Sequence, residues 1–164
     1  MRKQLERIYR EHRQGLFTLA LSITRSPDLA EDAVQEAFAR LWRSTARPEG
    51  DVVSYVFASV RNAAVDQARL RSAPGGPAVS IFDCDQTVDR TSPLSAAIGA
   101  ERREGVRRAV DALPPKQQET VVLRLYAGLT FQQIADTLGE PLQTVASRYR
   151  RALEQIRESL ENLT

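Results

Sequence analysis

The feature that most constrains the fold is a sharp break between two helical patterns near the C-terminal end of the chain. Apolar residues within 131–138 recur at intervals of three and four, the spacing of one face of an α-helix. Gly139 and Pro141 follow. Glycine favours the left-handed conformation at a helix end, and proline cannot continue a helix. Thr130 with Gln133 three residues later is typical of an N-terminal capping box. The sequence therefore predicts a short helix, a tight turn and a longer helix, which together form a helix-turn-helix.

The second of these helices is predicted to carry two distinct faces. Its apolar positions are expected to face the core and are Leu142, Val145, Tyr149, Ala152, Leu153, Ile156 and Leu160. A polar stripe with the same spacing consists of Thr144, Ser147, Arg148 and Arg151. At roughly 100° per residue, the two stripes are centred about 120° apart. One face can therefore pack inward while the other offers hydroxyl and guanidinium groups to a ligand.

The polar stripe has the chemistry of a DNA-reading surface. Arginine can read guanine or hold a phosphate, and serine and threonine can serve either role. The stripe also lies early in its helix, where a recognition helix touches base edges. Gln143 and Arg150 lie beside the stripe and are expected to meet the DNA backbone. The alternative is an ordinary solvated helix face on a small bundle.

The rest of the chain predicts further helices and no sheet, so the predicted fold class is all-α. Helical patterns indicate three helices in the first 70 or so residues, and Ser26 followed by Pro27 is a start signal for the second. The stretch 72–93 contains prolines and glycines without a helical period, which indicates a linker. We therefore expect two small helical domains joined by a flexible acidic linker, with the boundaries 1–72, 73–95 and 96–164.

Two polar faces of the first block are candidates for binding. Asp32, Gln35 and Glu36 crowd the outer side of its second helix, where they can dock a partner protein or simply stabilise the helix dipole. The third helix carries a second set, Arg61, Asn62, Asp66 and Arg69, with Tyr55 and Phe57 near its start. Aromatic rings beside arginines suit unpaired nucleic-acid strands, in which bases stack and phosphates are held. The alternative for Tyr55 is a place in the hydrophobic core.

Composition argues against several classes of protein. Cys84 and His12 are the only cysteine and the only histidine, so an internal disulfide, a zinc site and a histidine-based catalytic triad all lack partners. We therefore expect no enzyme activity, no metal and no cofactor, and Cys84 is interpreted as a bystander in a loop. No apolar run approaches the roughly 20 residues of a membrane span. The charged N-terminus does not look like a secretory signal, so a cytoplasmic location is expected.

With these residues laid out, the chain resembles a sigma factor of the extracytoplasmic-function group in the sigma-70 family. The resemblance covers nearly the whole chain, as region 2, a variable linker and region 4. Its most specific part is the stretch ALPPKQQETVVLRLYAGLTFQQIADTLGEPLQTVASRYRRAL, which follows the order of the family's fourth region. The resemblance implies that region 2 is a three-helix bundle and that region 4 is a helix-turn-helix domain.

The resemblance also implies roles for the candidate residues. In the segment AEDAVQEAFARLW, the residues that would bind core RNA polymerase are Asp32, Gln35 and Glu36. In the segment SYVFASVRNAAVDQAR, the residues that would melt and hold the minus-ten promoter element are Tyr55, Arg61, Asn62, Asp66 and Arg69. In region 4, the residues that would contact the minus-thirty-five element are Gln143, Thr144, Ser147, Arg148, Arg150 and Arg151. Residues 44–51 correspond to a loop that captures a flipped base, and the acidic linker corresponds to a segment that threads the channel of nascent RNA.

Three positions depart from the family pattern. The family usually has tryptophan at Tyr55, glycine at Gln143 and lysine at Ala146, and the absent lysine removes one phosphate contact. The implied partners are core RNA polymerase and promoter DNA, with an anti-sigma factor for those members that have one; no membrane insertion and no small-molecule substrate are implied. The runner-up interpretation is a polymerase-independent helix-turn-helix regulator with an N-terminal dimerisation block. That protein would bind duplex DNA tightly by itself.

Overall fold

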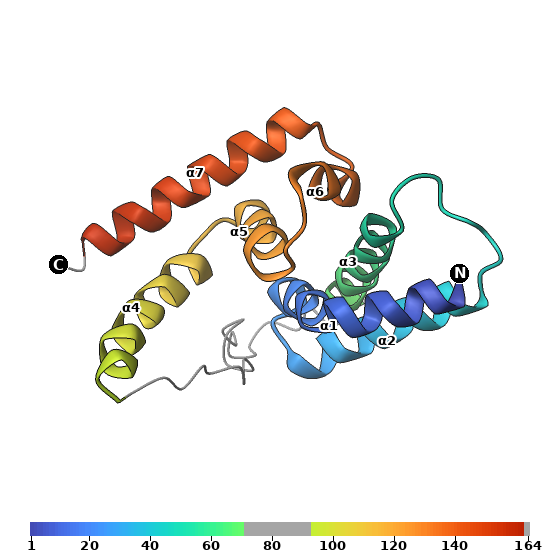
Figure 1. The fold of residues 1–164 in the computed structure, drawn as a ribbon, viewed down its shortest axis with the longest axis horizontal. Helices are drawn as coiled ribbons and strands as arrows, with labels where there is room; N and C mark the ends of the chain where they lie inside the picture. Colours follow the sequence, from blue (N-terminus) through green and yellow to red (C-terminus); the bar gives the residue numbers. More distant parts are fainter. Residues whose placement is uncertain (71–92, 163–164) are drawn as a thin grey trace.

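In this computed structural model, the described residues, 1–70 and 93–162, form helices joined by short turns, with no strand among them (Figure 1). The helices in chain order are α1 Arg2–Thr24, α2 Pro27–Arg43, α3 Val52–Leu70, α4 Pro93–Asp111, α5 Pro115–Val121, the π-helical turn η1 Val122–Tyr126, α6 Phe131–Leu138 and α7 Leu142–Glu161. The predicted all-α fold class is confirmed. Most of the predicted linker, including Cys84, lies outside the described residues, and α4 begins inside the range predicted for it.

Local signals explain where α2 begins. The backbone between α1 and α2 turns at Arg25, which adopts a left-handed conformation with φ 55° and donates its N–H to the carbonyl of Leu21. Ser26 then caps α2, because its side chain accepts a hydrogen bond from the backbone N–H of Leu29 at 3.4 Å. Pro27 occupies the first turn, where its missing N–H costs no hydrogen bond. The start signal predicted for this helix is confirmed.

Asp51 caps α3 and also ties that helix to α6. Its carboxylate oxygen Oδ2 accepts hydrogen bonds from the backbone N–H of Ser54 at 3.0 Å, from the Ser54 hydroxyl at 2.7 Å and from Gln133 Nε2 at 3.1 Å. Burial raises the pKa of Asp51, but these hydrogen bonds to its charged form outweigh burial, so its pKa lies below the usual 3.8. The ionised carboxylate therefore stabilises the fold.

Replacing Asp51 with alanine is expected to lower the free energy of unfolding by about 1–2 kcal/mol near neutral pH. Because the folded-state pKa is depressed, this contribution is fully present well above pH 3.8 and is lost as the pH falls through 3.8 towards the folded-state pKa. Urea unfolding of wild type and Asp51→Ala at a series of pH values should show the difference narrowing in acid. Asp51→Asn, which retains a capping oxygen without the charge, is the control. A difference that stays constant with pH would contradict the assignment.

The core of the first half is built from α1, α2 and α3, whose inward residues pack on one another. Phe57 is fully buried there, and His12 packs edge to face on its ring with centroids 5.6 Å apart. The expectation that Phe57 helps to stack unpaired bases is therefore wrong, because helical periodicity turns it towards α1. Tyr55, two residues earlier, is exposed on the opposite side of α3, which removes the core alternative for that residue.

A π-helical turn changes the predicted face of the segment that follows α5. Val121, Val122, Leu125 and Tyr126 are apolar and three or four residues apart, the spacing of one face of a single helix that would end at Gly128. The five-residue turn η1 instead widens the helix, so Leu123 is fully buried while the side chain of Leu125 is 57% exposed. Leu125 therefore does not lie on the buried face that this spacing indicates, since a π turn shifts the residues after it around the helix axis. Gly128 does end the segment, with φ +71°.

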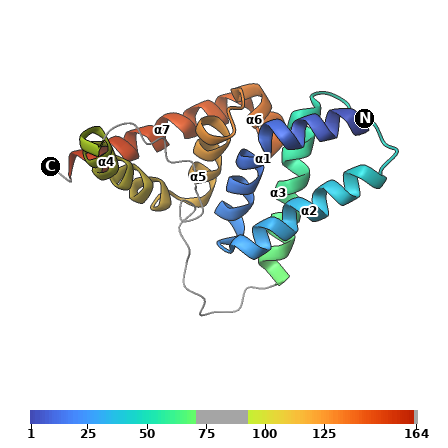
Figure 2. The same ribbon diagram turned by 60° about the horizontal axis from the view of Figure 1, so that its bottom comes forward.

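The second half of the chain packs directly against the first. In two views, α5, η1 and α6 lie beside α1 and α3, while α4 and α7 extend away (Figures 1 and 2). Buried residues of both halves form one continuous cluster. Polar contacts add to it. Arg25 Nη2 donates to Gln118 Oε1 at 2.7 Å, and Arg61 Nε lies 3.1 Å from Glu119 Oε2.

At Gly15, the backbone of α1 lies very close to Ala127 of the second half. A Cβ built on Gly15 of α1 would lie 2.8 Å from the Cα and 2.9 Å from the Cβ of Ala127. Neither atom belongs to a flexible side chain that can move away. A glycine is therefore needed here for the two halves to meet.

Gly15→Ala is expected to destabilise the closed arrangement by roughly 1–3 kcal/mol, because overpacking outweighs the usual gain of alanine in a helix. Thermal unfolding and the radius of gyration from small-angle scattering measure the effect. Gly99→Ala in α4 is the matched control, since its new Cβ would meet only the Arg103 side chain at 3.9 Å. The control should be neutral or slightly stabilising. Equal behaviour of the two variants would mean that the approach at Gly15 does not matter.

Candidate nucleic-acid interface

The helix-turn-helix predicted from the sequence is present, with both of its local signals in place. The capping box at the start of α6 is complete, since the Gln133 backbone N–H donates to Thr130 Oγ1 at 3.1 Å and the Thr130 N–H donates to Gln133 Oε1 at 3.0 Å. Gly139 ends α6 in the left-handed conformation with φ 66°. The rings of Phe131 and Tyr149, 5.3 Å apart, hold α6 against α7. These contacts fix the orientation of α7.

The predicted polar stripe of α7 lines one open hollow at the surface. The hollow has a volume of about 510 Å³ and is lined by Pro114, Lys116, Gln117, Gln143, Thr144, Ser147, Arg148 and Arg151. The four residues of the stripe and Gln143 are thus brought together on one side. Arg150 is exposed but does not line the hollow. A surface of hydroxyl, amide and cationic groups can form hydrogen bonds to phosphates and base edges.

Two residues of this surface were missed by the sequence analysis. Lys116 and Gln117 come from the first turn of α5, far from α7 in the sequence, and they form the opposite wall of the hollow. A signal did exist, because Lys116 is one of only two lysines in the chain and follows Pro115 at a helix start. Cations in such a position can hold a phosphate at the edge of the DNA groove.

Arg148 differs from the other members of the stripe because it is engaged within the protein. Its Nη2 donates to Glu140 Oε2 at 2.5 Å, and the two side chains are only 14% and 24% exposed. The hydrogen bond from Arg148 holds the pKa of Glu140 below its ordinary value against the opposing effect of burial. The sequence analysis did not single out Glu140, which lies in the turn between α6 and α7.

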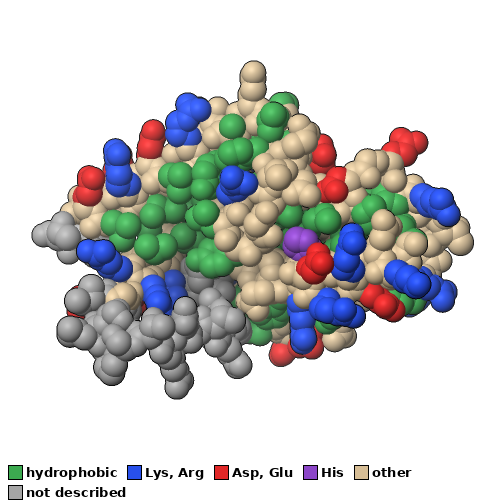
Figure 3. Space-filling view, viewed as in Figure 1, with side chains coloured by type: hydrophobic (Ala, Val, Ile, Leu, Met, Phe, Trp, Pro, Cys, Tyr) green, Lys and Arg blue, Asp and Glu red, His purple; other side chains and the backbone are tan. Residues whose placement is uncertain are grey.

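The apolar stripe predicted for α7 is confirmed for three of its residues and wrong for two others. Val145, Ala152 and Ile156 are buried. Leu142 and Leu153 are instead among the exposed large apolar side chains. The helix rests on α4, α5 and α6 along a strip narrower than the pattern implied. Figure 3 shows the resulting apolar surface on the face between α4 and α7.

The residues predicted to hold the minus-ten element are divided between two sides of α3. Tyr55, Asn62, Asp66 and Arg69 follow one another at intervals of seven, four and three, so they share one exposed face of the helix. Arg61 lies on another side, where its ion pair with Glu119 at 3.1 Å joins α3 to α5. The side chains of this pair are 29% and 12% exposed. In this arrangement Arg61 is therefore directed towards α5 and not along the face that the other four residues share.

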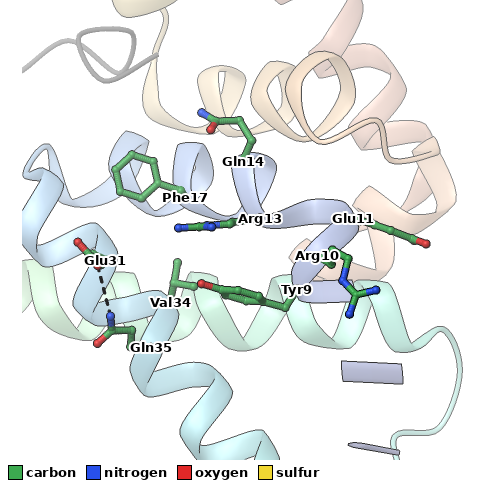
Figure 4. A pocket seen from close by; sticks show the side chains of 9 residues that line it. All are labelled: Tyr9, Arg10, Glu11, Arg13, Gln14, Phe17, Glu31, Val34 and Gln35. Atoms are coloured by element: carbon green, nitrogen blue, oxygen red, sulfur yellow. Dashed lines mark hydrogen bonds between the residues drawn. The ribbon is translucent and has the colours of Figure 1, made fainter. Parts of the chain in front are cut away.

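The three residues predicted to bind polymerase lie on the outer side of α2. Asp32 and Gln35 are exposed, and Glu36 is half-buried because Gln67 of α3 donates to its Oε2 at 3.1 Å while Arg40 pairs with its other oxygen. Gln35 donates to Glu31 at 3.4 Å (Figure 4). Both of these residues line a groove of about 550 Å³ between α1 and α2, whose other wall includes Tyr9, Arg10, Glu11, Arg13 and Gln14 (Figure 4).

Two further properties of the described residues bear on function. Within 1–70 and 93–162, no helix has both the length and the apolar character needed to cross a membrane. In the same ranges, no group of three or more histidine, cysteine, aspartate or glutamate side chains is placed to hold a metal ion.

Comparison with known proteins identifies the family. Residues 8–73 match the profile of Sigma-70 region 2, and residues 103–156 match that of Sigma-70, region 4. Among curated relatives, the ECF RNA polymerase sigma factor SigK of Mycobacterium tuberculosis is 26% identical over 93% of this chain and 83% of its own length. The ECF RNA polymerase sigma factor SigE of Mycolicibacterium smegmatis is 31% identical over 94% of this chain and 61% of its own length.

Solved structures agree with this fold. The sigma factor RpoE, in complex with the anti-sigma factor NepR from Bartonella quintana, superposes with a TM-score of 0.71 at 21% identity, over 98% of this chain and 96% of that one. CnrH, in complex with the cytosolic domain of CnrY, superposes with a TM-score of 0.66 at 19% identity, over 100% and 92%. The chain therefore belongs to the sigma-70 family, as a sigma factor of its extracytoplasmic-function group.

Proposed function

We propose that this sigma factor directs transcription initiation through three separate surfaces, and that α7 contacts the upstream promoter element. The observation that carries the proposal is the shared surface of α7 and α5, where Thr144, Ser147 and Arg151 lie opposite Lys116 and Gln117. With α7 in the major groove, the arginine and hydroxyl groups contact base edges while Lys116 and Gln117 meet phosphates. Gln143 and Arg150, at the sides of α7, contact the DNA backbone.

The minus-ten element is assigned to the exposed face of α3. Tyr55 offers a ring on which an unpaired base can stack, and Asn62, Asp66 and Arg69 follow it along the same face. Arg61 lies outside that face, because its Nε pairs with Glu119 of α5, so it can join them only after this ion pair opens. Minus-ten binding through Arg61 therefore requires the contact between Arg61 and Glu119 to break.

Core RNA polymerase is assigned to the outer face of α2. Asp32 and Gln35 are exposed there, and Glu36 is fixed by Gln67 and Arg40, which leaves the acidic face in a defined geometry. With these assignments, the domain boundaries are placed at 1–72, 73–95 and 96–164. The protein acts in the cytoplasm and does not itself catalyse a reaction. The described groove beside Gln35 extends this surface towards α1.

The weak charge of the chain fits a factor that acts as part of a larger complex. Net charge is only +2, so electrostatic attraction to DNA is small for the isolated protein. Once both halves are held on polymerase, the second promoter contact becomes intramolecular, and two weak contacts add through effective concentration. An anti-sigma partner fits the same scheme, because one of the superposed structures, RpoE, is in complex with the anti-sigma factor NepR and exposed apolar side chains lie on α7.

Run-off transcription with core polymerase, with and without this protein, tests the proposal. Promoter-specific transcripts should appear only when the protein is added, and the protein alone should bind the same duplex weakly. Tight binding of the isolated protein to a palindromic duplex, without stimulation of transcription, would instead identify a polymerase-independent regulator.

A further inference from the structure

We infer that Glu140 determines specificity at the upstream-element surface, because it holds the Arg148 guanidinium in a fixed orientation for base reading. This inference rests on the proposed role of α7 and adds a residue to it. Glu140 is not part of the polar stripe. It acts on that stripe through Arg148, which makes it a positioning residue.

The backbone that carries Glu140 is held on both sides. Its N–H donates to the carbonyl of Ala135 at 3.0 Å, which anchors it to the end of α6. Gly139 before it adopts the left-handed helix end with φ 66°, and Pro141 after it begins α7 with a restricted φ of −61°. The carboxylate is therefore presented from a rigid turn and not from a mobile loop.

The ion pair uses only part of the Arg148 guanidinium. Nη2 donates to Glu140 Oε2 at 2.5 Å, while a guanidinium has five N–H donors in a planar fork. Arg148 also lines the hollow with Thr144 and Ser147, so its remaining donors can be reached from outside. With the side chain only 14% exposed, rotation of the fork is restricted. A fixed fork favours bidentate pairing with one base over loose contact with any phosphate.

The negative charge of Glu140 also favours binding that depends on the DNA sequence. A carboxylate next to the DNA-facing hollow repels phosphates, so it weakens contacts that do not depend on sequence. Lys116 and Arg61 lie close enough to favour its ionised form, which keeps the charge in place at neutral pH. Glu140 therefore lowers affinity for any duplex and raises the share of binding that depends on sequence.

Holoenzyme assembled from core polymerase and full-length protein tests the inference on promoters with a randomised upstream element. Glu140→Ala is expected to reduce discrimination at one base-pair position roughly 5- to 20-fold, while affinity for non-promoter duplex rises and its salt dependence steepens. Glu140→Gln, which keeps the shape but not the charge, should give an intermediate loss. Glu154→Ala, on the exposed far part of α7, is the control and should leave discrimination unchanged.

A double-mutant comparison separates positioning from direct contact. In an Arg148→Ala background, Glu140→Ala should cause no further loss of discrimination, because the residue it positions is absent. Additive losses would overturn the inference, as would unchanged discrimination in Glu140→Ala while Arg148→Ala alone loses it. If wild type and Arg148→Ala both show no preference at any upstream position, the proposed role of α7 fails as well. A structural effect alone would lower thermal stability without changing which base is preferred.

Discussion

Arg151→Ala is expected to reduce promoter-specific transcription by roughly 5- to 100-fold while leaving the affinity for core polymerase unchanged. Arg151 is exposed and lines the hollow shared by α7 and α5, one turn beyond Ser147. In the described residues it has no ion pair, so its guanidinium can bind DNA without first breaking a contact. Run-off transcription at saturating core polymerase measures the first quantity, and titration of core with labelled protein measures the second.

Arg157→Ala is the matched control on the same helix. Arg157 lies nearly two turns further along α7, outside the hollow, with a side chain that is 75% exposed and 3.8 Å from Glu161. Its loss should change transcription by less than about twofold, since an exposed ion pair contributes little. A comparable decrease in both variants would show that general positive charge matters and not the α7–α5 surface. Loss of core binding in Arg151→Ala would show that α7 has another role.

Glu119→Lys is expected to open the two halves of the protein. The substitution replaces the partner of Arg61 with a second cation in a contact where the two side chains are now 29% and 12% exposed. Breaking a largely buried pair in this way costs about 3 kcal/mol, enough to shift the closed arrangement towards open forms. The radius of gyration from small-angle scattering should increase, and the hydrogen bond between Gln133 and Asp51 should be lost with it.

A charge exchange provides the control for this result. Combining Arg61→Glu with Glu119→Arg restores an opposite-charge pair at the same place and should restore the compact form at least in part. Glu104→Lys, an exposed change on α4 next to Arg108, should leave the size of the molecule unchanged. If Glu119→Lys remains as compact as wild type, the apolar contacts around Gly15 are sufficient to hold the halves together.

The helix-turn-helix could be predicted in detail because each of its signals is local. The capping pair Thr130 and Gln133 is three residues apart, Gly139 directly follows its helix, and both patterns appear in the structure as expected. The polar stripe of α7 could be predicted for the same reason, since helical geometry places every third or fourth residue on one side. Nothing beyond one stretch of sequence was needed.

Errors arose where a residue's environment depends on a distant helix. Phe57 is an aromatic residue close to Tyr55 and to the arginines of α3, as a nucleic-acid contact would be. It is instead buried against His12 of α1. Leu153 has the spacing of a core residue, yet no helix covers it. The π turn after α5 changed the face of Leu125 without any breaker residue that could have indicated it. Periodicity gives the direction of a side chain relative to its own helix. It does not show whether another helix covers that side chain.

The sequence by itself determined the helical class, the ends of most helices, the helix-turn-helix and the family. These depend on interactions within a few residues of one another, which the order of residues specifies directly. Only the tertiary structure decided that the two halves pack through Gly15 and Ala127, that Arg61 is paired with Glu119 58 positions away, and that Lys116 faces α7. Such contacts depend on how whole helices pack, and many distant pairings are compatible with the same local patterns.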